Sequence, residues 1–208
     1  MIFSVRWRRC CNIAPAARLF AGDMAAGRYN WIQLEKEEHM DIFDAIATRR
    51  SVRKYTDRPV TDEDIRTGLE AAMMAPSAGN AQPWHFVVVR DAALRARVAE
   101  LNVYAAMART APAGILVCGD LHLEKYPGFW VQDCSAAIQN LLLAAHGLGL
   151  GAVWTGIHPV AEREEGFRRA FGLPAEVVPL GYIVLGHPDQ HPHSGSRFRE
   201  DRVHRDVW

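Results

Sequence analysis

The segment 131–148 constrains the fold most strongly, because its apolar residues occur around nearly the whole circumference of the helix that it predicts. These residues include Ile138, Leu141, Leu142, Ala145 and Leu148. A helix of this kind has to be buried on most of its sides, and one small subunit offers few faces that could cover it. We therefore expect this helix to be buried in the fold and to contribute to a subunit interface.

The length and charge of the chain limit the number of domains and the kinds of partner. At 208 residues the chain is long enough for one well-buried domain and short for two. Its 24 lysines and arginines balance 24 aspartates and glutamates, so no net field attracts nucleic acid or an anionic membrane. The apolar runs 113–118 and 141–145 are far shorter than the ~20 residues of a membrane span. We expect a soluble protein that binds neither nucleic acid nor a membrane.

The cysteines and histidines indicate neither a disulfide framework nor a metal site. The four cysteines, at positions 10, 11, 118 and 134, contain no C-x-x-C pair. The tail carries His187, His191, His193 and His204, but no cysteine or carboxylate accompanies them at ligand spacing. We expect a reducing, cytoplasmic location and no bound metal.

The first 39 residues differ from the rest of the chain. They have no sustained hydrophobic period, and four arginines, at positions 6, 8, 9 and 18, precede the first acidic residue, Asp23. An arginine-rich, acid-poor start resembles an organelle transit peptide; the alternative is a disordered extension that is not part of the working domain. We expect the domain itself to span residues 40–208.

Predicted helices alternate with predicted strands from Asp41 onward. Helices are expected at 41–49, from the N-cap Thr61 to Pro76, at 92–109 and 131–148, and at 161–171, where Gly172 ends the helix. Strands are expected at 86–89, 114–118, 152–154 and 177–185. Beyond Gly186 the chain becomes polar and extended. This order predicts an α/β or α+β fold.

Two segments carry side chains suited to binding a ligand. The run Arg49, Arg50, Ser51 and Arg53 ends the first helix with three guanidinium groups and a hydroxyl, which can grip a phosphate; the alternative is a solvated charge run. The loop 75–84 combines small residues with the polar side chains of Ser77, Asn80 and Gln82, or is an ordinary turn. The glycines of 147–156 follow a helix and precede a strand, the wrong order for a Rossmann phosphate loop.

Together, four motifs in series resemble the nitroreductase family, from about residue 41 to the end. They are I-x-x-R-R-S-V-R from Ile46, A-P-S-x-x-N-x-Q-P-W from Ala75, the stretch D-x-x-x-A-x-Q-N-L-L-L-A-A-x-x-L-G-L-G-x-x-W-x-G from Asp133 to Gly156, and R-F-x-x-x-x-V-H-x-x-x-W from Arg197 to Trp208. Two features depart from the family: residues 1–39 have no counterpart, and Ser196 stands where many members have a basic residue.

The resemblance implies a fold, an assembly and a set of cofactor-binding residues. The expected fold is α+β, with a central mixed sheet flanked by helices, in an interlocked homodimer whose C-terminal arm crosses to the partner. FMN would lie at the interface, and no catalytic side chain is expected because the flavin carries the chemistry. The residues that would bind FMN from the two subunits are Arg49, Arg50, Ser51, Arg53, Pro76, Ser77, Asn80, Gln82, Thr155, Gly156 and Arg197.

The implied activity is that of an FMN-dependent oxidoreductase. NADH or NADPH would reduce the flavin, and a nitroaromatic, a quinone or a related acceptor would reoxidise it in a ping-pong sequence. Two alternatives remain open: a specialised family member such as a dehalogenase or an enone reductase, and a non-catalytic flavin-binding or flavin-storage protein.

Overall fold

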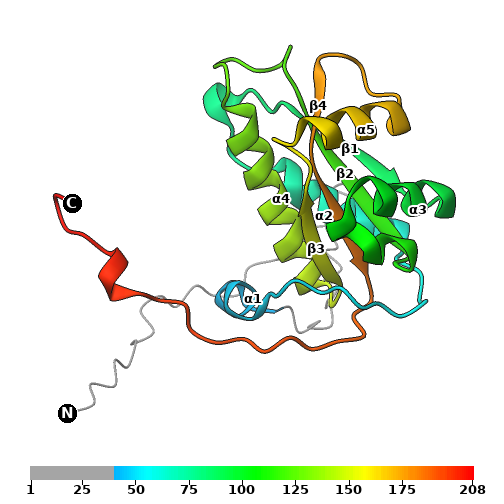
Figure 1. Ribbon diagram of the computed structural model, residues 1–208. Helices are drawn as coiled ribbons and strands as arrows, with labels where there is room; N and C mark the ends of the chain where they lie inside the picture. The colour runs from blue at the N-terminus through cyan, green and yellow to red at the C-terminus, as the bar shows by residue number, and fades with distance from the viewer. Residues whose placement is uncertain (1–39) are drawn as a thin grey trace, which may run out of the picture. The chain divides into compact units, whose positions relative to one another are not determined.

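A four-stranded sheet forms the centre of the protein in the computed structural model, which describes residues 40–208 (Figure 1). The segment 1–39, for which an extension outside the working domain is predicted, lies outside the described residues. The strands are β1 (Trp84–Val89), β2 (Ala113–Asp120), β3 (Gly151–Gly156) and β4 (Val177–Gly186), and their order across the sheet is β1-β2-β4-β3.

The α+β class is confirmed, but the strand ladders are all antiparallel. Within residues 40–208, parallel pairing is limited to an isolated bridge between Ser51 and Ala152 at the outer edge of β3. The expected mixed sheet is therefore reduced to this single contact. The reason is that the segment after the first helix reaches β3 only briefly before it moves away, so it adds a bridge and not a strand.

The described residues also form five α-helices and three short 3-10 segments. The α-helices are α1 (Ile42–Thr48), α2 (Asp62–Met73), α3 (Ala92–Leu101), α4 (Trp130–Gly147) and α5 (Ala161–Phe171). The 3-10 segments are η1 (Ala78–Asn80), η2 (Val103–Arg109) and η3 (Glu200–Arg202). The predicted helix 92–109 is thus divided into α3 and η2. The division falls at Asn102, which leaves helical geometry and accepts a hydrogen bond from the Tyr104 amide, 3.1 Å away.

Helices cover both faces of the sheet, and Figure 1 shows α4 and α3 on opposite sides of it. Because strand side chains alternate between faces, Ile115 packs toward α2 and α4, while its neighbour Leu116 packs toward α3 and α5. Helix α4 is buried along most of its length, as its apolar pattern predicts. It stays partly exposed at Leu143 and Ala144, so one stripe of the helix is left uncovered by the other residues of 40–208.

The tight packing between β2 and β4 gives a direct test of the core. Gly114 lies under the aromatic ring of Tyr182, and a Cβ at this position would overlap that ring. Gly114→Ala should therefore destabilise the protein by about 1–3 kcal/mol, measured by urea unfolding. Gly68→Ala is the matched control, because a Cβ there would meet Leu141 at an ordinary 4.0 Å. Inside α2 it should stabilise by about 0.5–1 kcal/mol, and similar losses in both variants would contradict this packing.

Candidate functional site

The end of α1 and the C-terminal tail meet in an open pocket of about 660 Å³. Its lining includes Arg49 and Arg50 from the segment after α1 and Arg197 from the tail. The helix ends here because Arg49 leaves helical geometry, and the chain then pairs with β3 through the Ser51–Ala152 bridge and the Val52 amide, which donates to the Ala152 carbonyl at 3.0 Å. The pocket therefore brings together two predicted parts of the site, Arg49 and Arg197, which are 148 positions apart in the sequence.

The electrostatics of this pocket favour an anion. Burial, and then the charges of Arg50 and Arg197, lower the pKa of Arg49. Arg50 donates to the carbonyls of Arg49 and Gly195, at 2.7 and 3.4 Å, while its Nε is buried without a partner among residues 40–208. Within the same residues, none of these three arginines pairs with a carboxylate. Converging cations with an unused donor suit a phosphate group.

His146 lies beside this pocket and was missed by the sequence reasoning. Thr48 donates its hydroxyl proton to the Asp44 carbonyl at 2.6 Å, so it accepts from Nε2 of His146, 2.8 Å away. Burial, followed by the charges of Arg49 and Arg50, lowers the pKa of His146, which favours the neutral ring. His146 therefore ties the last turn of α4 to the end of α1. No sequence signal links two residues that are 98 positions apart.

The outer edge of β3 continues from the arginine pocket toward Gly156. The backbone of Ala152 faces Val52, away from β4, and backbone groups alternate along a strand, so Gly156 also faces outward. A Cβ at Gly156 would meet nothing within 4 Å. Thr155 faces β4 instead, and its hydroxyl donates to the Tyr182 carbonyl at 2.9 Å. Gly156 therefore lies at the open edge of β3, while Thr155 holds β3 against β4.

The parallel direction of the Ser51–Ala152 bridge orders the predicted residues along this edge. Ser51, Val52 and Arg53 advance in the same direction as β3 does from Ala152 to Gly156. Ala152 and Gly156 are separated by about 13 Å along the strand. Arg53 is exposed and does not line the arginine pocket, but it lies further toward the Gly156 end. One elongated ligand with a phosphate at one end fits this arrangement.

The predicted residues of the α2–β1 loop lie elsewhere. The loop is held at the first turn of α4, where the Ala78 amide donates to Oδ1 of Asp133 at 3.0 Å. Pro76, Asn80 and Gln82 are exposed, and Ser77 accepts from the Gln82 amide at 3.0 Å. Asp133 and His146 are about 20 Å apart along α4. The two halves of the predicted site therefore lie at opposite ends of α4 in one chain.

An apolar surface on α1, α2 and α4 lies between these two ends. Phe43 and Met74 are 77% and 80% exposed, and Ile42, Ile46 and Met73 are also exposed. We call this region the α1–α2–α4 surface; it includes a hollow of about 470 Å³ lined by Met74, Leu143 and Ala144 among others. Large exposed apolar patches mark interaction sites.

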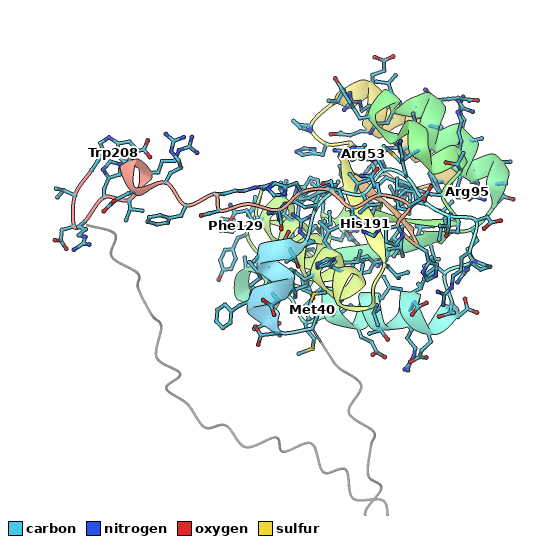
Figure 2. The ribbon with its side chains drawn as sticks, turned by 90° about the horizontal axis from the view of Figure 1, so that it is seen from below. Met40, Arg53, Arg95, Phe129, His191 and Trp208 are labelled. Carbon is cyan, nitrogen blue, oxygen red and sulfur yellow. The ribbon has the colours of Figure 1, made fainter. Side chains whose placement is uncertain are left out.

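The tail is also exposed and carries apolar side chains. Figure 2 shows the chain leaving the folded body after His191 and extending to Trp208. The exposed apolar side chains of this tail are those of Phe198, Val203, Val207 and Trp208. The apolar area of this extended tail is not covered by the rest of the described chain, and large exposed apolar areas mark interaction sites.

Other kinds of site receive no support from residues 40–208. No group of three or more histidine, cysteine or acidic side chains in this range could hold a metal ion. None of the helices found there is both long and apolar enough to cross a bilayer. Burial raises the pKa of the Cys118 and Cys134 thiols to about 12, which makes them poor nucleophiles.

Comparisons with known proteins show which family this chain belongs to. The family model described as the nitroreductase family matches residues 46–106 and 100–187. A Methanothermobacter thermautotrophicus protein, provisionally named NADH dehydrogenase/NAD(P)H nitroreductase, is 52% identical over 173 residues, 83% of this chain and 91% of that protein.

Solved structures of proteins named as nitroreductases are also similar to this chain. A Parabacteroides distasonis protein with the same provisional name has a TM-score of 0.78 at 40% identity, covering 80% of this chain and 98% of the other. A Desulfovibrio desulfuricans protein, provisionally named a nitroreductase and solved in complex with FMN, has a TM-score of 0.71 at 37% identity, covering 80% and 97%.

Proposed function

Because this chain belongs to the nitroreductase family, we propose that it is an FMN-dependent oxidoreductase that uses NADH or NADPH to reduce nitroaromatics, quinones or related acceptors. The observation that carries the proposal is the convergence of Arg49, Arg50 and Arg197 on one pocket without a carboxylate partner in the described chain. A phosphate monoester supplies the missing negative charge.

The residues along β3 would hold the remaining parts of the cofactor. Arg49 and Arg197 would bind the phosphate, Ser51 would lie next to the polar chain, and Arg53 would lie further toward the ring. The outward amide of Gly156 would be available to the planar ring, which could approach closely because glycine has no side chain. When bound, FMN supplies the redox chemistry by accepting a hydride from the nicotinamide and passing electrons to the acceptor.

The protein's own contribution is to bind and orient the cofactor. Thr155 anchors β3 to β4, and the Gly156 carbonyl accepts hydrogen bonds from Asn102 and Arg163, at 3.1 and 3.2 Å. These contacts fix the end of β3 at which the ring would bind. Protons for the reduced acceptor come from solvent or the cofactor, so no side chain acts as an essential acid or base.

The site is completed by a second copy of the chain. Ser77 and Asn80 belong to the loop that is held at the start of α4, and they do not line the arginine pocket, which lies near the other end of this helix. A two-fold homodimer formed through the α1–α2–α4 surface would bring the loop of one subunit to the arginine pocket of the other. In such a dimer the C-terminal tail of each subunit would cross to the other subunit, which would cover its exposed apolar side chains.

The two half-reactions should separate in an anaerobic stopped-flow experiment. NADH or NADPH alone should bleach the yellow colour of the holoprotein, and a nitroaromatic or quinone added later should restore it, because one open edge serves both reactants in turn. Double-reciprocal plots should be parallel. Bleaching that requires the acceptor to be present already would exclude the ping-pong sequence. A holoprotein that neither nucleotide bleaches would be a flavin-storage protein instead.

A further inference from the structure

Asp133 is a buried carboxylate that the proposed mechanism does not use. It is 5% exposed and lies in the first turn of α4, where Oδ1 accepts a hydrogen bond from the Ala78 amide at 3.0 Å. Its Oδ2 is also buried and has no hydrogen-bond partner within the described part of the chain. A carboxylate buried with one oxygen unpaired is costly, so its presence calls for a specific role.

Within residues 40–208, the one hydrogen bond of the Asp133 side chain is to the loop that carries the predicted contacts to the partner's cofactor. This loop has an unusual backbone, because Gly79 and Asn80 both have positive φ angles, of 59° and 53°. Asparagine adopts the left-handed region more readily than most residues with a side chain, but the conformation still costs free energy, so contacts at the neighbouring residues help to hold the loop there. The partial positive charge at the start of α4 favours the carboxylate in its place.

Lys125 holds the next residue of the same loop. Its Nζ donates to the Gly79 carbonyl at 2.6 Å, and a Cβ at Gly79 would come within 2.9 Å of the Tyr126 ring. An anionic acceptor therefore binds the Ala78 amide, and a cationic donor binds the Gly79 carbonyl. Charge-assisted hydrogen bonds of this kind are stronger than neutral ones. The two contacts immediately precede Asn80, which is exposed.

We infer that Asp133 is a positioning residue that, together with Lys125, holds residues 77–80 in the conformation in which Asn80 meets the partner subunit's FMN. The inference rests on the proposed function. Asp133 lies behind the loop and acts through the Ala78 amide, not through contact with the cofactor. The hydrogen-bond acceptor at Oδ1 is the part of the side chain that matters.

The test compares two substitutions that differ in this acceptor. Asp133→Asn keeps an oxygen for the Ala78 amide, and Asp133→Leu removes it while keeping the site filled. Asp133→Leu should weaken FMN binding by about 10- to 100-fold in a fluorescence titration, and Asp133→Asn should stay within about threefold of the parent protein. Hydrogen exchange of the Ala78 amide should become fast in Asp133→Leu alone.

Lys125→Met gives a second test that does not disturb the interior, because Lys125 is exposed. It should weaken FMN binding about three- to tenfold, whereas Arg97→Met, at an exposed cation on α3, should have no effect. Equal FMN affinities for the parent, Asp133→Leu and Lys125→Met would overturn the inference, and so would an Asp133→Asn variant as weak as Asp133→Leu. If the parent protein binds no FMN, the proposed function fails, while unchanged Ala78 exchange in Asp133→Leu refutes the positioning role by itself.

Discussion

Replacing Arg49 and Arg197 together by alanine should weaken FMN binding by at least about a hundredfold. Hydrogen bonds to a charged group contribute roughly 1.5–3 kcal/mol each, so two such residues account for about two to four orders of magnitude in affinity. Both line the pocket at the end of α1, and the charges of Arg50 and Arg197 already lower the pKa of Arg49. The substitutions remove charges that repel one another, so the fold should stay intact. Fluorescence titration of the apoprotein with FMN measures the affinity.

The matched control for this double variant is Arg169→Ala. Arg169 is an exposed arginine on α5 that pairs with Glu165 at 3.1 Å and lies outside the pocket. Its loss should leave the FMN dissociation constant unchanged, and circular dichroism should report the same fold for both variants. A double variant that binds FMN as tightly as Arg169→Ala would rule out the arginine pocket as the phosphate site.

Introducing charge on the α1–α2–α4 surface should dissociate the protein into monomers. Ile42→Glu combined with Met74→Glu would bury four unpaired carboxylates in a two-fold dimer, at a cost of several kcal/mol. The dimer dissociation constant should rise by on the order of a thousandfold or more. Sedimentation at low micromolar concentration should show one chain per particle, and the bound FMN should be lost with the partner.

Leu94→Glu is the control for the interface, because Leu94 is an exposed apolar residue on α3, on the other face of the sheet. It should sediment like the parent protein and retain its flavin. If the double variant remains a flavin-bearing dimer, the subunits associate through a different surface.

Local signals in the sequence predicted many individual elements. Thr61 begins α2 with a capping box that includes Asp64, and Gly172 ends α5 with a φ of 62°, because both positions depend on short-range hydrogen bonding and backbone geometry. The burial of α4 followed from its apolar circumference. The break at Asn102 was missed although one of its contacts is local, the hydrogen bond that its side chain accepts from the Tyr104 amide; the other contact, from its side-chain amide to the Gly156 carbonyl, is long-range.

The candidate site was predictable only in part, for the same reason. The arginine segment and the α2–β1 loop were recognised as motifs, but sequence order cannot reveal that they lie at opposite ends of one helix. The pairing of His146 with Thr48 and of Asp133 with Ala78 joins residues 98 and 55 positions apart. Such contacts depend on how α4 packs against the rest of the chain, which no local pattern encodes.

The length of α4 sets a constraint on how this protein can diverge. Asp133 near its start holds the α2–β1 loop, and His146 in its last turn holds the end of α1. Inserting one residue between them would advance the second contact by about 1.5 Å and turn it by about 100° around the helix axis. One of the two contacts would then be broken. The length of α4 therefore fixes the distance between the α2–β1 loop and the end of α1. Insertions and deletions should accumulate outside α4, in the connecting loops.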